Sequence, residues 1–207
     1  MRAARQITTI TALALASALA MGGCALRSAP SEFYTLSALS SGESNAQTAR
    51  EDLAIGIGPV SFPEFLDRPQ IVTRSSPHRL ELDEFHRWGG SLRADFVSVL
   101  GDNLSTLLGT SRIVVYPTDP PFKLTHSILL AVQTYEGTLG KGASLVVRWA
   151  VVEGQNGRAL LVRQSRITET VSSADHEALV AAQSRALAAL SHEIAAAISG
   201  LAEPRKR

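Results

Sequence analysis

The chain has 207 residues, of which 45% are hydrophobic and 19% are charged, and its formal net charge at pH 7 is +1. So balanced a charge favours neither nucleic acid nor an acidic membrane surface as a partner. With one cysteine the chain cannot form an internal disulfide, so the folded part must depend on its hydrophobic core.

The first 23 residues have the pattern of an export signal. Arg2 and Arg5 precede an apolar segment of about fifteen residues, which is shorter than the about 20 that a membrane-spanning helix needs. Gly22 and Gly23 then precede Cys24, an arrangement that resembles a bacterial lipobox. We therefore expect cleavage before Cys24 and lipidation of its thiol. An ordinary export signal with an incidental cysteine is the alternative.

Cleavage leaves 184 residues, enough for one domain with a full core. Because Arg2 and Arg5 leave with the signal, 18 basic residues then face 19 acidic ones, and the net charge becomes −1. We expect residues 24–31 to form a lipidated tether, in which the seven residues after Cys24 reach at most about 25 Å. The domain then covers residues 32–203, and residues 204–207 form a short basic tail.

The next segments predict short strands. Residues 32–39 read as a first strand, followed by an exposed loop over 40–50. In residues 53–60, apolar side chains alternate with others, which predicts a half-buried strand that Pro59 stops. Residues 70–74 and 79–83 predict two further strands joined by a turn.

The first helix is predicted from Ser91 to Gly109, because leucine, phenylalanine and valine repeat there at helical spacing. A strand over 112–116 follows, and then three long strands near 124–132, 145–151 and 159–171.

A second helix is expected to begin near Ser172 or Ser173, with acidic residues in its first turn, and to end at Gly200 and Pro204. The predicted fold is a single α/β domain, in which two long amphipathic helices cover a mixed, mostly antiparallel sheet.

A search for catalytic and cofactor-binding patterns finds none. No Gly-x-Ser-x-Gly elbow occurs, and the glycines of residues 137–142 lack the spacing of a phosphate loop, so they predict a turn. No two histidines have the i, i+4 spacing of a helical metal site. Asp83 and His86 are interpreted as a solvated strand end. We expect neither an enzyme, a cofactor nor a metal site.

Two segments are candidates for binding a partner protein. The loop between the strands at 53–60 and 70–74 contains three prolines, which restrict its conformation, and it carries Phe62, Phe65, Leu66 and Arg68. It is either a docking ridge or a cap on the core. Trp88 precedes the first helix, where it either packs onto that helix or forms an exposed anchor.

These segments resemble the ABC-type transport auxiliary lipoproteins, the family that includes the PqiC lipoproteins. The most specific match is Leu66-Asp-Arg-Pro-Gln70. Weaker matches are Phe33-Tyr-Thr-Leu36, Ile55-Gly-Ile-Gly-Pro-Val60, Trp88, Asn103-Leu104 and Val115-Tyr-Pro117. The family usually has Trp-Ala-Glu-Pro-Leu where this chain has Trp88-Gly-Gly-Ser-Leu92, so the acidic residue is missing.

The resemblance implies a non-enzymatic component of a lipid-transport system that crosses the envelope. Its partners would be a protein with MCE domains and, through that protein, an ABC transporter of the inner membrane. Ala25 follows the lipidated cysteine, which in such lipoproteins implies an outer-membrane anchor with the domain facing the periplasm. Homo-oligomers are compatible with the sequence.

Two other functions stay open. The protein could bind a lipid or another apolar small molecule between its sheet and helices, or it could be a structural lipoprotein of the envelope.

Overall fold

A computed structural model describes residues 30–40, 50, 52–154 and 156–202. The predicted signal peptide, Cys24, most of the tether, nearly all of the loop over 40–50 and the basic tail lie outside these residues. The chain divides into two units at Pro30, and the unit that begins at Ser31 contains every described helix and strand.

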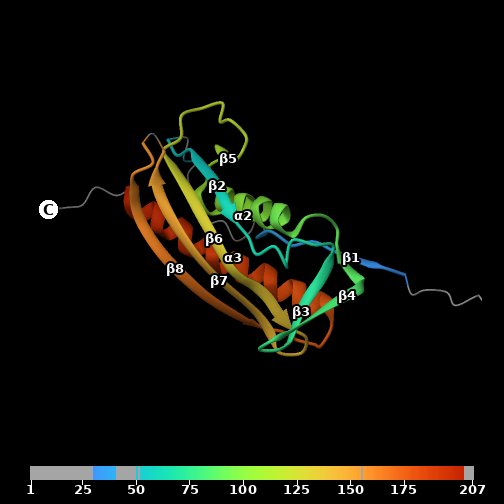
Figure 1. Cartoon of the computed structure of the whole chain (residues 1–207). Coiled ribbons are helices and arrows are strands. Elements are labelled where there is room, and N and C mark those ends of the chain that lie inside the picture. Colours follow the sequence, from blue (N-terminus) through green and yellow to red (C-terminus); the bar gives the residue numbers. More distant parts are fainter. Residues whose placement is uncertain (1–29, 41–49, 51, 155, 203–207) are drawn as a thin grey trace, which may run out of the picture. The chain divides into compact units, whose positions relative to one another are not determined.

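Eight strands and two helices make up this unit (Figure 1). The strands are β1 (Glu32–Tyr34), β2 (Ile55–Ser61), β3 (Gln70–Ser76), β4 (Arg79–Trp88), β5 (Ile113–Val115), β6 (His126–Thr138), β7 (Gly142–Glu153) and β8 (Ala159–Thr170). The helices are α2 (Leu92–Leu108) and α3 (His176–Ala202).

Strand β6 organises the sheet. Along one edge it pairs antiparallel with β7, which pairs antiparallel with β8. Along its other edge β6 pairs in parallel with β2 first and with β3 further on, while β5 lies beyond β2, and β4 and β1 lie beyond β3. Four of the seven strand pairs are parallel, so the prediction of a mostly antiparallel sheet is wrong. Local sequence patterns predict antiparallel hairpins. They do not reveal the crossover connections between distant strands, and these connections make the other strand pairs parallel.

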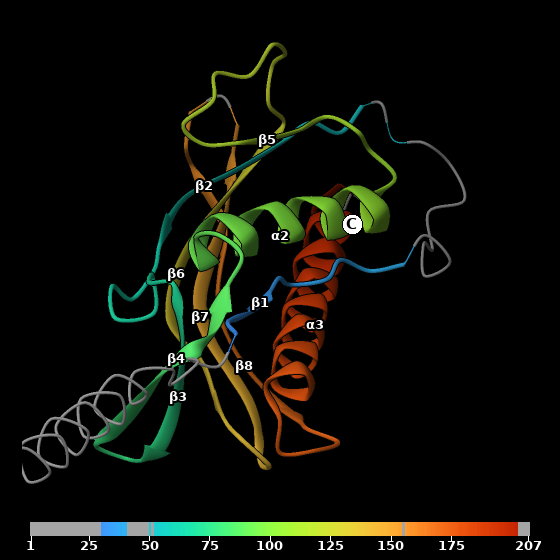
Figure 2. The same cartoon turned by 90° about the vertical axis from the view of Figure 1, so that its right-hand side faces the viewer.

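Both helices contribute to one core with the sheet. Helix α3 packs along β6, β7 and β8, whereas α2 packs against α3, β2 and β5, and the two helices cross in Figure 2. The largest buried side chains come from all of these layers, including Trp149, Tyr135 and Phe96. The prediction of two amphipathic helices on a mixed sheet is therefore confirmed.

Helix α2 begins and ends as its sequence predicts. The N-cap residue Ser91 accepts a hydrogen bond from the Ala94 N–H through its side chain. Gly109 ends the helix in the left-handed conformation (φ 64°), which glycine adopts without steric cost.

Helix α3 begins later than predicted, but its end at Ala202 lies between Gly200 and Pro204, as predicted. Its first residue is His176, because Asp175 rather than Ser172 or Ser173 caps it by accepting the Ala178 N–H at 2.7 Å. The helix also continues past Gly200 to Ala202. A glycine weakens a helix by only about 1 kcal/mol, so it does not end one by itself.

Strand β2 also differs from its prediction. Leu53 to Ile57 are all buried, since β2 lies between β5 and β6 and is covered by α2. The strand continues through Pro59 to Ser61, with a shift of register against β6 between Ile57 and Val60. Such an irregularity accommodates a proline, which cannot donate to a ladder.

Neither described helix is both long enough and apolar enough to span a bilayer.

Candidate functional site

The chain that follows β1 is a strap across the two helices. The sequence predicts a strand over 32–39, but β1 ends at Tyr34, and residues 35–40, here called the strap, run between α2 and α3 without a neighbouring strand (Figure 2). Within the strap, the Leu36 side chain is buried in the core.

Helix side chains take over the role of a strand ladder for the strap. The Leu36 N–H donates to Asp95 Oδ2 at 2.7 Å, and the Leu39 N–H donates to Asn103 Oδ1 at 2.7 Å. Between them, the Ser37 N–H donates to Ser184 Oγ at 3.1 Å. Asp95 and Asn103 belong to α2 and Ser184 to α3, so the strap holds the two helices together.

A long groove follows the strap along the exposed side of α3. One cavity of about 470 Å³ lies between Ser37–Leu39 and α3, and another of about 420 Å³ adjoins β1. The two share Ser37, Ala181 and Ser184, so they form one groove, which we call the α3 groove.

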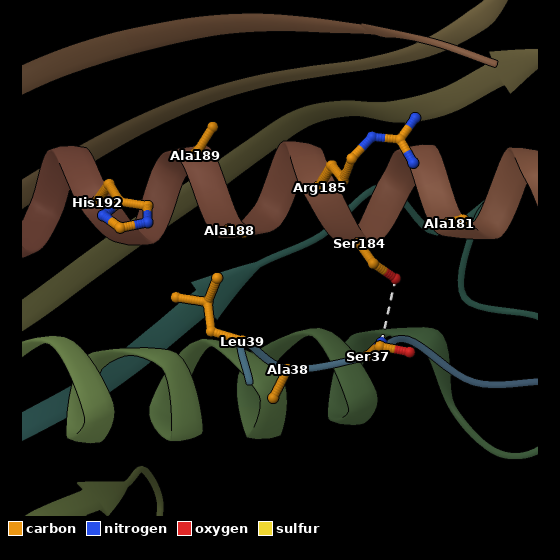
Figure 3. Close-up of a pocket in the computed structure, with 9 residues that line it drawn as sticks. All are labelled: Ser37, Ala38, Leu39, Ala181, Ser184, Arg185, Ala188, Ala189 and His192. Carbon is orange, nitrogen blue, oxygen red and sulfur yellow. Dashed lines mark hydrogen bonds between the residues drawn. The ribbon is translucent and has the colours of Figure 1, made fainter. Parts of the chain in front are cut away.

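The lining of the α3 groove favours binding over chemistry. Figure 3 shows Leu39 pointing toward α3, where Ala181 and Ala188 are small residues, whereas Ala189 points away from the strap. Arg185 points away from the strap and donates to Glu169 Oε2 at 3.2 Å and to the Thr170 carbonyl at 2.7 Å. A groove lined by small side chains and by polar groups, with its arginine already paired, suits a chain segment of another protein.

The predicted docking residues do not all lie on the surface. Phe62 is buried in edge-to-face contacts with Phe96 and Tyr135, at ring-centroid distances of 5.7 and 6.3 Å. Leu66 and Trp88 are buried in the same core. The sequence leaves two interpretations open for this loop and for Trp88, contact with a partner or packing in the core. For Phe62, Leu66 and Trp88 the structure favours packing. Their side chains are not available to a partner in this structure.

Phe65 and Arg68 remain candidates for a partner surface. The Phe65 side chain is 36% exposed, and Arg68 is half-buried on the same loop. The Arg68 Nε atom is buried and has no hydrogen-bond partner among the described residues.

The Leu66-Asp-Arg-Pro-Gln70 segment connects the loop to the start of α2 by hydrogen bonds and an ion pair. Asp67 accepts a hydrogen bond from the Ser91 hydroxyl at 2.9 Å and forms an ion pair with Arg93 at 3.3 Å. The Pro69 carbonyl accepts the Trp88 N–H at 2.7 Å. The most specific motif of the sequence therefore has a structural role whatever its function.

Sequence reasoning missed the exposed aromatic residues near the tether. Phe33 on β1 is 67% exposed and Phe85 on β4 is 44% exposed. Phe33 pairs in register with Arg87, two residues beyond Phe85. The available signal was an aromatic residue at the start of the first predicted strand, which the structure places at the edge of the sheet.

Comparison with known proteins gives one clear family. The model of the ABC-type transport auxiliary lipoprotein component matches residues 34–195, which include the strap, α2 and most of α3. No sequence among the curated proteins matches the chain significantly.

Solved structures share the fold. A protein from Xanthomonas campestris is 15% identical, with 83% of this chain and 97% of that chain covered and a TM-score of 0.68. The crystal structure of an uncharacterized protein is 16% identical, with 82% and 99% covered and a TM-score of 0.67. At these identities the likeness establishes the fold and nothing further.

Proposed function

The chain belongs to the family of ABC-type transport auxiliary lipoprotein components, and from that membership we propose that it is the outer-membrane lipoprotein of an MCE-type lipid-transport system. In this proposal it contributes binding rather than catalysis. It contacts an MCE-domain protein in the periplasm and, through that protein, an inner-membrane ABC transporter.

The observation that carries the proposal is the family match over residues 34–195. Two features of the sequence agree with it. Cys24 follows an export signal with lipobox spacing, and Ala25 follows Cys24 as in lipoproteins released to the outer membrane.

The anchor has a direct physical consequence for binding. A single acyl chain binds a bilayer only marginally, whereas two or more give durable attachment at about 0.8 kcal/mol per buried CH₂. The seven residues that follow Cys24, 25–31, then keep the domain within about 25 Å of the bilayer. The effective concentration of the domain for a partner that reaches this membrane rises accordingly.

We place the partner contact at Phe65 and Arg68. An aromatic and an arginine side chain are typical anchors of protein interfaces. The loop that carries them is fixed by Asp67 and by the buried Phe62 and Leu66, so little conformational entropy is lost when it binds.

Intact mass spectrometry of the membrane-extracted protein tests the anchor. The expected mass is that of a chain beginning at Cys24 plus its acyl groups. A chain processed at the same residue without acyl mass would contradict the lipoprotein assignment of this particular chain.

Capture of the MCE-domain protein tests the contact. We expect the double variant Phe65→Ala, Arg68→Ala to retain its fold by circular dichroism but to capture at least tenfold less partner, since such anchors contribute about 2 kcal/mol each. Phe85→Ala is the matched control, because it removes an exposed aromatic side chain elsewhere. Loss of capture only in Phe85→Ala would move the contact to β4.

A further inference from the structure

Side chains of metal-ligating types meet where β4 reaches the first turn of α3. Asp83 and His86 belong to β4, and His176 is the first residue of α3. One potential ligand atom from each lies within 4.8 Å of the others. The sequence spacing grouped Asp83 only with His86, which is why a solvated strand end was expected there.

The Asp83 carboxylate is fixed with one oxygen free for a ligand. Its Oδ1 accepts the backbone N–H groups of Phe85 at 2.9 Å and His86 at 3.0 Å. Its Oδ2 lies 3.6 Å from His176 Nε2. Ligand atoms of a tetrahedral zinc site lie about 3.3 Å apart, so this pair is already close to the required spacing.

A hydrogen-bond chain sets the tautomer of His86. The Tyr34 hydroxyl lies 2.7 Å from Glu32 Oε2 and 2.8 Å from His86 Nδ1, and it has a single proton to donate. When the tyrosine donates that proton to the Glu32 carboxylate, its oxygen can only accept from His86. The His86 Nδ1 atom then carries the proton that it donates to the tyrosine, and Nε2 keeps its lone pair. Metal-binding histidines are held by such partners on the other ring nitrogen.

The surroundings favour a cation. Glu32 Oε2 lies 3.6 Å from His86 Nδ1, and the carboxylates of Asp83 and Asp175 are further negative charges beside His176.

The two imidazoles need one rotation to converge. Their rings are stacked with centroids 3.9 Å apart and planes 13° apart, so the ring-nitrogen lone pairs lie in two nearly parallel planes and do not converge on one point. The χ2 torsion of histidine has broad minima, and turning one ring directs its nitrogen toward the other. His176 is buried, whereas the Asp83 and His86 side chains are 34% and 28% exposed, which leaves a side open for entry.

We propose that Asp83, His86 and His176 form a binding site for a divalent transition metal, with Zn²⁺ as the best-suited ion. Two imidazoles and one carboxylate are ligands that zinc accepts, with water at the fourth position. The ion would join β4 to the start of α3 and, through Tyr34, hold β1 where the tether enters. This inference does not depend on the transport role.

Titration with Co²⁺, a spectroscopic substitute for Zn²⁺, tests the site. The probe is added to the full chain purified in detergent without a polyhistidine tag. We expect visible d–d absorption that saturates at one equivalent and disappears when Zn²⁺ is added. The variants His176→Ala and Asp83→Asn should lose it, and Tyr34→Phe should bind about 10- to 100-fold more weakly.

Two controls keep the test decisive. His192→Ala removes an exposed histidine from the same helix and should bind as the unaltered protein does. Asp83→Asn can still accept the two backbone N–H groups through Oδ1, so it decides the question if His176→Ala fails to fold. Absence of a saturable spectrum, equal loss in His192→Ala, or a thiolate charge-transfer band from Cys24 would overturn the assignment.

Discussion

Asp67 shows how one side chain can hold two elements in place. It accepts the hydroxyl proton of the N-cap residue Ser91 and pairs with Arg93 in the first turn of α2. We expect Asp67→Ala to lower the free energy of unfolding by about 1 kcal/mol, measured by urea denaturation. Glu64→Ala, at an exposed position of the same loop, is the control. Equal losses in both variants would show that the α2 contact contributes nothing.

His126 makes stability depend on pH. Burial lowers its pKa below the usual 6.5, although the Glu153 carboxylate acts in the opposite direction. Between the lowered pKa and about 6.5 the unfolded chain binds more protons than the folded one, so stability falls as the pH drops through 6.5. We expect His126→Gln to reduce this slope in urea unfolding, with the exposed His192→Gln leaving it unchanged. An identical slope in His126→Gln would contradict the prediction.

At the scale of single residues, sequence reasoning identified important positions but not always their roles. Phe62, Leu66 and Trp88 stood out because large apolar residues are unusual in a polar loop or before a helix. Packing against residues such as Phe96 and Tyr135, which are distant in sequence, decided that they lie in the core. No local pattern contains that information.

The strap is the element on which both helices depend. Asn103 is fully buried, accepts the Leu39 N–H and donates to Ser191 Oγ at 3.1 Å. Asn103→Ala leaves the Leu39 N–H without its acceptor, while Ser191 Oγ keeps its bond to the Leu187 carbonyl, so we expect a loss of about 1–3 kcal/mol in stability. Hydrogen exchange of the Leu39 amide should accelerate by more than the loss in the free energy of unfolding of the whole domain accounts for. The exposed neighbour Asp102→Ala should change neither measurement. An unchanged Leu39 exchange rate would mean that the strap is held otherwise.

The sequence predicted well those elements whose ends or faces are marked by residues within the element itself. Ser91 and Gly109 marked both ends of α2, and the hairpins among β6, β7 and β8 followed from alternation and turns. The strap could not be predicted, because its hydrogen-bond acceptors lie on helices 59 to 147 positions away in the chain. Parallel pairing of β2 with β6 was missed for the same reason.

At the scale of the whole molecule, the filled core bears on the lipid-binding alternative. Trp149, Tyr135 and Phe96 are buried between sheet and helices, whereas the α3 groove lies on the outer side of α3, beside the strap. We therefore expect native mass spectrometry of the full chain to show no lipid beyond covalent acyl groups. A stoichiometric additional lipid would favour the lipid-binding function instead.

Affinity isolation of the protein from cross-linked membranes, followed by mass spectrometry, tests the central claim most directly. We predict enrichment of an MCE-domain protein and of the ABC transporter subunits, relative to a control domain carried on the same Cys24 anchor. Recovery of the anchored protein with no transporter component above that control would contradict the account.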